Sequence, residues 1–182
     1  MAYRLKKTVV LVGMMGAGKT AVGTALARLL GVPFLDSDAE IEAAANMTIA
    51  EIFARDGEPF FRDKEAQVLS RLLDERLGVL STGGGAYLTE RNRQVIHDKA
   101  VACWLNADLE LLWNRVRHKD TRPLLRTPDP KKTLTEMYEA RVPFYSQAEV
   151  HVAARAEYTI EEMARKTIEA LLAHPDILEE AP

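Results

Sequence analysis

The sequence predicts an α/β fold, in which a five-stranded parallel sheet is covered by helices on both faces to give three layers. Five short apolar segments alternate with stretches whose apolar residues recur at helical spacing, as in a parallel sheet with helical crossovers. The first of these segments, residues 8–12, is β-branched and apolar, and it runs directly into a glycine loop that opens a helix. We therefore expect one domain over residues 1–182, with a core from about 7 to 172.

The glycine loop reads Gly-Met-Met-Gly-Ala-Gly-Lys-Thr at residues 13–20 and matches the phosphate-binding motif G-x-x-x-x-G-K-[ST]. Glycines let successive backbone N–H groups face an anion, and the new helix adds its positive end. In this motif Lys19 reaches the β- and γ-phosphates, and the Thr20 hydroxyl holds Mg²⁺. The predicted nucleotide-binding residues are Gly13, Gly16, Ala17, Gly18, Lys19, Thr20 and Ala21.

Two other interpretations of this loop are open. A chance glycine turn is disfavoured because the strand and the helix are both present. The pattern from Gly16 to Ala21 also fits the dinucleotide fingerprint G-x-G-x-x-A, and Asp36 follows Gly16 by 20 residues, where a ribose-binding acid would lie. A dinucleotide site, however, has no use for Gly13 together with the Lys19–Thr20 pair.

Composition narrows the class of protein. With 47% apolar and 28% charged residues and a net charge of -3, the chain is an ordinary globular protein, and nucleic-acid or membrane-surface partners are disfavoured. The single Cys103 allows no internal disulfide and is expected in the core. No segment approaches the apolar length of a membrane span, and the histidines show no ligand spacing. We expect a cytoplasmic monomer.

The second predicted strand, residues 32–35, is followed by two acids, Asp36 and Asp38. Ligands of open parallel sheets bind beyond the carboxyl ends of the strands, so both acids should face the phosphate loop. The alternative is that Ser37 or Asp38 only caps the following helix.

The helices follow from capping residues and apolar spacing. Thr48 and Glu51 form a capping box, and Pro59 lies at the start of a longer helix. In that helix Arg62 and Glu65 are three residues apart and could pair on one face, although such a pair is usually a surface bridge. Helices are expected over residues 21–30, 39–45, 48–56, 58–76, 89–97, 107–116, 131–147 (interrupted by Pro143) and 159–172.

The third strand, residues 78–82, ends in three glycines, Gly83, Gly84 and Gly85. Such a run marks close approach by a ligand or another backbone, with a flexible turn as the alternative. Many phosphate-loop enzymes carry a Mg²⁺ acid at this kind of position. No acid stands here, so Asp36 takes the metal role by elimination. The remaining strands are expected at residues 100–105 and 149–153, and residues 174–182 are expected to form a tail.

Residues 117–130 are basic, rich in proline and without periodicity. A loop of this length in a compact domain is typical of a lid or of a disordered segment. Its arginines, with Arg115 just before it, suit a lid that closes over phosphates, and a solvated charge run is an equal alternative.

Asp38, Arg62, Arg141 and the glycine triplet together indicate a small polar pocket. Arginine forks bind carboxylates through paired hydrogen bonds, and a carboxylate such as Asp38 can accept a hydroxyl proton. The phosphate loop with Thr20 and Asp36 on Mg²⁺ makes ATP the expected phosphoryl donor. The predicted acceptor is a small hydroxylated carboxylic acid.

Over about residues 7–172 the chain resembles the shikimate kinases. The resemblance rests on six segments in order: the phosphate loop, Asp36-Ser37-Asp38, Phe61-Arg62-x-x-Glu65, Gly83-Gly84-Gly85, Arg122-Pro123-Leu124-Leu125 and Arg141-x-Pro143-x-Tyr145. It implies a phosphate-loop enzyme of the nucleoside-monophosphate-kinase structural type with a mobile lid. Such an enzyme transfers the ATP γ-phosphoryl group to the 3-hydroxyl of shikimate, in aromatic amino-acid biosynthesis.

The resemblance also implies residue roles. Lys19, Asp38 and Arg122 would be catalytic, with Asp38 on the shikimate hydroxyls as base or orienter and Arg122 in the lid between both substrates. Asp36 would be the Mg²⁺-associated acid, and Arg115 would stack on adenine. The shikimate-binding residues would be Asp38, Arg62, Glu65, Gly83, Gly84, Gly85 and Arg141.

Two rival functions differ in the features they need. A kinase for another small acid, such as gluconate, would keep the loop but does not need two carboxylate-binding arginines together with two acids. A nucleotide-switch module that binds GTP usually carries an Asn-Lys-x-Asp signature, which does not occur in this sequence.

Overall fold

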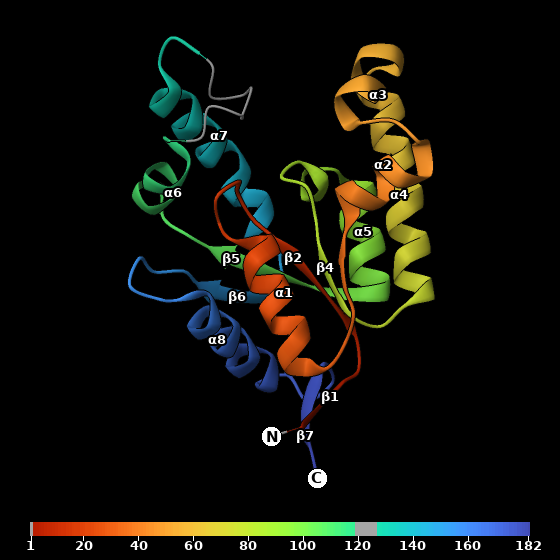
Figure 1. Ribbon diagram of the computed structural model, residues 1–182, viewed down its shortest axis with the longest axis vertical. Coiled ribbons are helices and arrows are strands. Elements are labelled where there is room, and N and C mark those ends of the chain that lie inside the picture. The colour runs from red at the N-terminus through yellow and green to blue at the C-terminus, as the bar shows by residue number, and fades with distance from the viewer. Residues whose placement is uncertain (1, 119–126) are drawn as a thin grey trace.

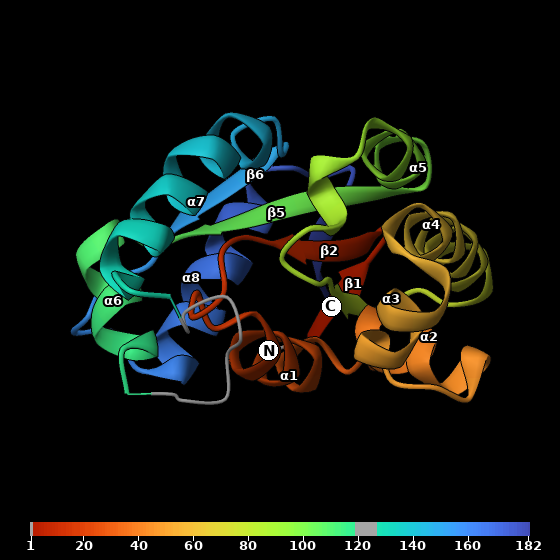
Figure 2. The same cartoon turned by 90° about the horizontal axis from the view of Figure 1, so that it is seen from above.

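A computed structural model of the chain describes residues 2–118 and 127–182. At its centre lies a five-stranded parallel sheet with the strand order β3-β4-β2-β5-β6 (Figures 1 and 2). This confirms the predicted α/β class. The strands are β2 (Thr8–Val12), β3 (Phe34–Asp36), β4 (Val79–Ser81), β5 (Ala100–Asn106) and β6 (Val150–Ala153).

Helices cover both faces of the sheet. Figure 2 shows α1 and α8 on one side and α5 and α7 on the other, with α2, α3 and α4 beyond the β3 edge. The bounds are α1 (Lys19–Leu30), α2 (Ser37–Ala45), α3 (Ile49–Asp56), α4 (Glu58–Glu75), α5 (Glu90–Lys99), α6 (Leu109–Val116), α7 (Pro130–Tyr145) and α8 (Ile160–Leu172), with a short 3₁₀ helix, η1 (Ala86–Leu88), after β4.

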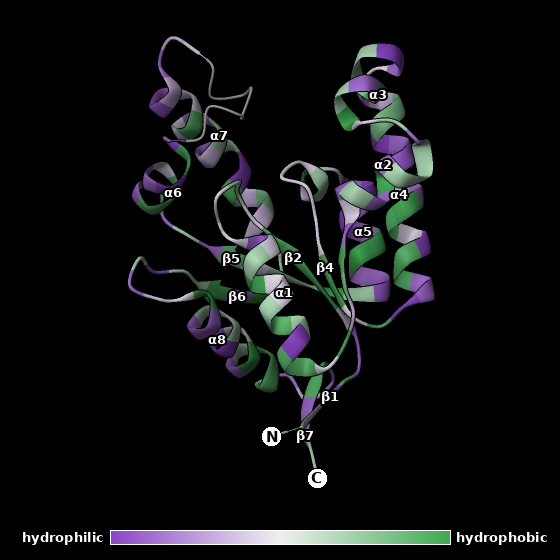
Figure 3. Cartoon of the chain, in the orientation of Figure 1, coloured by the Kyte–Doolittle hydropathy of each residue, from purple (hydrophilic) through white to green (hydrophobic). Residues whose placement is uncertain are grey.

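The central strand explains why the fold holds together. Every residue of β2 is buried, and Val9, Val10 and Leu11 are fully so, because helices cover the sheet on both sides. Figure 3 shows the apolar colouring gathered in the sheet, while the outward surfaces of the helices carry the polar residues. The buried Cys103 lies in this core, as expected. No helix among the described residues is long and apolar enough to cross a membrane.

The ends of the chain differ from the prediction. Residues 174–182 were expected to be a tail, but Leu178–Ala181 forms strand β7, which pairs antiparallel with β1 (Ala2–Leu5). The two side chains that anchor this ribbon, Ile177 and Leu178, are buried in the main core. The short, acidic β7 has too little apolar alternation to be recognised as a strand from its sequence.

The second difference concerns α7, where an interruption at Pro143 was expected. The helix runs through this proline and ends two residues later, at Tyr145. A proline so near the C-terminus removes one backbone hydrogen bond without dividing the helix. The predicted lid at residues 117–130 falls mostly on residues 119–126, which lie outside the described residues together with Arg122.

Candidate active site

The phosphate loop joins β2 to α1 and places its backbone N–H groups at the start of that helix. Gly18 is the N-cap residue, with a left-handed φ of 93°, and Lys19 and Thr20 form the first turn. Gly16 also has a positive φ, and a Cβ atom added there would lie 2.7 Å from Val116 Cγ1. The Lys19 ammonium donates a hydrogen bond to the Gly13 carbonyl. The loop thus presents the helix dipole and a cation on one side.

A cavity of about 610 Å³ opens over this loop at the carboxyl ends of β2, β3 and β4. This is where ligands bind in open parallel sheets. Its walls include most residues predicted for the nucleotide and metal sites. Those residues are Gly16, Ala17, Gly18, Lys19, Thr20, Ala21, Asp36 and Arg115, and of the residues predicted for shikimate, Asp38, Gly83 and Gly84 also line the cavity.

The two acids after β3 have different tasks in the fold. Asp36 Oδ1 caps α2 by accepting hydrogen bonds from the backbone N–H groups of Asp38 (2.9 Å) and Ala39 (3.4 Å). The alternative in which Ser37 or Asp38 caps this helix is therefore wrong. Because Asp36 is the cap, the Asp38 side chain is free to point away from the helix terminus and into the cavity.

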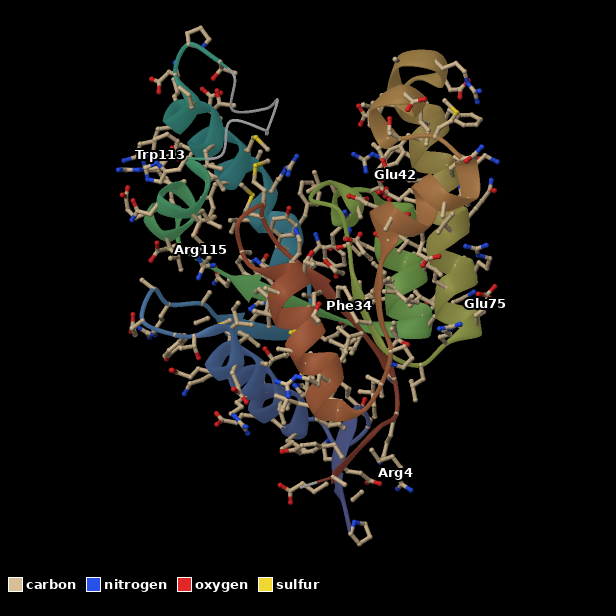
Figure 4. All side chains as sticks on the ribbon, in the orientation of Figure 1. Arg4, Phe34, Glu42, Glu75, Trp113 and Arg115 are labelled. Carbon is tan, nitrogen blue, oxygen red and sulfur yellow. The ribbon has the colours of Figure 1, made fainter. Side chains whose placement is uncertain are left out.

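Asp38 lies in an environment that disfavours its charge. Burial raises the pKa of its carboxyl to about 6, and the neighbouring carboxylates of Asp36, Glu65 and Glu42 add to the shift, while Lys19 opposes it. Figure 4 shows Glu42 on α2, on the opposite side of the site from Arg115 on α6. Carboxyl groups with raised pKa values in a cavity are typical of catalytic acids and bases.

The three glycines after β4 each face one charged side chain. A Cβ atom added at Gly83 would lie 2.7 Å from Asp38 Oδ1, and one at Gly84 would lie 3.0 Å from Arg141 Nη1. At Gly85 the added atom would overlap the Arg62 guanidinium. Side chains from α2, α4 and α7 therefore meet on one backbone segment, which has the close approach that the glycines predicted.

The Arg62–Glu65 pair is not a surface bridge. Glu65 is 1% exposed, and Arg62 Nη1 donates to its two carboxylate oxygens at 2.9 and 3.1 Å. Asn92 on α5 donates a third hydrogen bond to Glu65 Oε1 at 2.8 Å. A carboxylate held by three hydrogen bonds keeps the guanidinium in a fixed place beside Gly85.

Sequence reasoning assigned no role in the site to several residues around it. Tyr145 on α7 donates a hydrogen bond from its hydroxyl to the Gly84 carbonyl at 2.6 Å, and burial raises the pKa of that hydroxyl, so it stays protonated. Tyr158, Ile160 and Met163 line the cavity at the start of α8. The apolar spacing of α8 had indicated core positions, yet Ile160 is 54% exposed.

Arg115 joins the nucleotide side of the site. Its Nη1 donates to the Gly16 carbonyl at 3.0 Å, so the C-terminal turn of α6 is attached to the phosphate loop. Figure 4 shows the side chain directed from α6 toward the sheet. Arg115 and Tyr158 both line the cavity, and the flat groups that these residues carry can stack on a base.

A phosphate loop beside a carboxylate with a raised pKa and two arginines defines a phosphate-loop kinase that acts on a small acidic molecule. The family model for shikimate kinase matches residues 15–172. The chain is 64% identical to a shikimate kinase of Ruegeria pomeroyi, covering 98% of this chain and 91% of that one. It is 66% identical to one of Cereibacter sphaeroides, covering 97% and 88%. This chain belongs to the shikimate kinase family.

Solved structures agree with this assignment. The shikimate kinase of Acinetobacter baumannii in complex with shikimate superimposes with a TM-score of 0.83 at 37% identity, covering 92% of this chain and 93% of that one. A gluconokinase of Sinorhizobium meliloti superimposes with a TM-score of 0.60 at 18% identity, covering 93% and 94%. The second likeness shows the shared fold alone.

Proposed function

We propose that this chain transfers the γ-phosphoryl group of ATP to the 3-hydroxyl of shikimate, giving shikimate 3-phosphate and ADP for aromatic amino-acid biosynthesis. The observation that supports this most is the convergence of Asp38, Arg62 and Arg141 on one glycine segment beside the phosphate loop. Two cations and one anion on that segment suit a substrate with a carboxylate at one end and hydroxyls at the other.

In this proposal the acceptor is held at both ends. Arg62 and Arg141 bind the carboxylate, and Glu65 holds Arg62 in place. Gly84 and Gly85 leave room for these arginines, and Gly83 leaves room for Asp38. Asp38 accepts the hydrogen bond of the reacting hydroxyl. Its pKa of about 6 leaves it mostly ionised at neutral pH, while its basicity is higher than that of an ordinary aspartate.

Phosphoryl transfer mostly needs positioning and neutralisation of charge. The hydroxyl oxygen forms a bond to the γ-phosphorus, the bond from that phosphorus to the bridging oxygen of ADP breaks, and the hydroxyl proton goes to Asp38. Lys19 lies where it can meet the phosphates, and the α1 N-terminus adds its dipole. Arg115 would stack on adenine, and Arg122 would complete the site from the lid.

Magnesium fits the residues that line this cavity. Thr20 offers a hydroxyl and Asp36 a carboxylate whose capping bonds both fall on Oδ1, and Mg²⁺ typically takes one or two carboxylates together with substrate phosphates. When bound, the ion would neutralise charge on the phosphates. The residues that would hold it are Thr20 and Asp36.

A coupled assay of ADP release tests the proposal. With MgATP we expect turnover on shikimate and little on gluconate, and chelation of Mg²⁺ should stop it. GTP in place of ATP serves as the nucleotide control. Turnover on gluconate but not on shikimate would refute the proposed substrate, and tight GTP binding without turnover would favour a switch module.

A further inference from the structure

Asn92 is a buried polar residue that the proposed function does not use. It lies on α5, which packs against α4, and its side chain is fully buried. Figure 1 shows these two helices side by side, with the backbone after β4 approaching them from the sheet. A buried amide is expensive to keep unless its hydrogen bonds serve a purpose.

Both donors of the Asn92 amide are in use, and they reach two different parts of the site. Nδ2 donates to Glu65 Oε1 at 2.8 Å and to the Ala86 carbonyl at 2.9 Å. Both partners can only accept, so the amide nitrogen must face them. Ala86 directly follows the glycine triplet. The Asn92 side chain therefore connects Glu65, which holds Arg62, to the backbone next to Gly85.

The other end of this amide is costly to the fold. Asn92 Oδ1 is buried without a hydrogen-bond partner among the described residues. Such an atom forfeits the hydrogen bonds that it would make with water, and an apolar residue of similar shape would avoid that loss. The donors of Asn92 must therefore contribute something that an apolar side chain could not.

We propose that Asn92 is a positioning residue for the acceptor: it fixes the Glu65 carboxylate and the backbone after Gly85, and so sets the orientation in which Arg62 meets a substrate carboxylate. The Arg62 guanidinium lies close to Gly85 and donates hydrogen bonds to Glu65. A shift of the Gly85 backbone or a rotation of the Glu65 side chain would therefore move the guanidinium. This inference rests on the proposed function, because it takes Arg62 as a carboxylate-binding residue.

Two variants of nearly unchanged shape separate the donors of Asn92 from its bulk. Asn92→Leu removes both hydrogen bonds, and we expect KM for shikimate to rise about tenfold while KM for MgATP stays within twofold. Asn92→Asp places a carboxylate against Glu65. The ratio of its KM for shikimate to the wild-type KM at the same pH should be largest at pH 8. This ratio should fall toward pH 6, because a proton shared with Glu65 restores that hydrogen bond, but it should stay above 1, because the bond to the Ala86 carbonyl is still missing.

The control is Thr167→Val on α8, which also removes a hydrogen bond from a fully buried side chain, that of Thr167 Oγ1 to the Met163 carbonyl (2.8 Å). It should lower thermal stability and leave both KM values unchanged. Adding Asn92→Leu to Arg62→Lys should raise KM for shikimate little further, because Asn92 acts through Arg62.

The outcomes distinguish this inference from the proposed function. Absence of shikimate phosphorylation by the wild type would refute the function itself. If the wild type is active and Arg62→Lys raises KM for shikimate, the inference is refuted when the Asn92 variants behave like Thr167→Val. An Asn92→Asp variant whose relative KM does not change with pH would also overturn it. Should Asn92→Leu fail to fold, the pH series of Asn92→Asp decides alone.

Discussion

Asp38 shows, at the scale of one residue, how a site can cost the fold stability. The pKa of its carboxyl is about 6 in the folded chain against an ordinary 3.8, so between these pH values the folded state binds the proton more readily than the unfolded chain. The contribution of Asp38 to stability therefore falls as pH rises from 3.8 through 6. At neutral pH the ionised carboxylate therefore lowers the stability of the folded state. In the proposed reaction the same carboxylate accepts the hydroxyl proton.

We predict that Asp38→Asn makes the protein more stable and much less active. At pH 7.5 the free energy of unfolding should rise by about 1–2 kcal/mol, which allows for the contact of Asp38 with solvent, and this gain should shrink at pH 5. The kcat should fall at least about a hundredfold while ATP binding is kept. Urea denaturation at both pH values and steady-state kinetics measure these effects.

The control is Glu169→Gln at an exposed position of α8, which also removes one negative charge. It should change neither the free energy of unfolding nor kcat. In the wild type, activity should decline as pH falls through about 6, because protonated Asp38 cannot take the hydroxyl proton. Full activity of Asp38→Asn would mean that this carboxylate has no part in the reaction.

At the scale of elements, the C-terminal turn of α7 is attached to the glycine segment. Tyr145 donates to the Gly84 carbonyl, and Arg141, one turn earlier, lies against Gly84 itself. Arg93 of α5 donates to the Tyr87 carbonyl at 2.9 Å and lies over the Phe144 ring at 5.0 Å. The helix that carries Arg141 is thus held to the backbone that carries the pocket.

We predict that Tyr145→Phe raises KM for shikimate about fivefold, with a smaller change in KM for MgATP. The lost hydrogen bond is worth on the order of 1 kcal/mol, and both Gly84 and Arg141 become less restrained. Tyr138→Phe, on the same helix, is the matched control and should leave both values unchanged. Equal shifts in both KM values after Tyr145→Phe would show that the hydroxyl does not act through the shikimate side of the site.

At the scale of the whole molecule, local signals predicted the sheet and the position of the site. The phosphate loop and the Thr48 capping box depend on neighbouring residues, so the sequence alone was enough to locate them. The roles of Asn92 and Tyr145 depend on contacts across 27 and 61 positions of the chain, to Glu65 and Gly84. The periodicity of apolar residues does not predict these long-range contacts, because they form only when the helices pack in the folded chain.

The same reasoning accounts for the missed ribbon at the chain ends. Pairing of β1 with β7 joins residues 2–5 to residues 178–181, and neither segment has a convincing strand pattern. Its stability comes from the burial of Ile177 and Leu178 and from ion pairs of Glu179 with Arg4 and with Lys6, the latter at 2.9 Å. Figure 1 shows this ribbon at the end of the molecule away from α6, α7 and α3.

Because the ribbon and the site lie at opposite ends of the sheet, stability and substrate binding should be separable there. We predict that Leu178→Ala, at a fully buried position, lowers the free energy of unfolding by about 2–4 kcal/mol and leaves both KM values within twofold of wild type. Glu180→Ala on the exposed side of β7 should stay within about 0.5 kcal/mol. Denaturation measures the free energy of unfolding, and steady-state kinetics below the melting temperature measure the two KM values. A selective rise in KM for shikimate would contradict the prediction, because it would show that the ribbon and the pocket are coupled through the sheet.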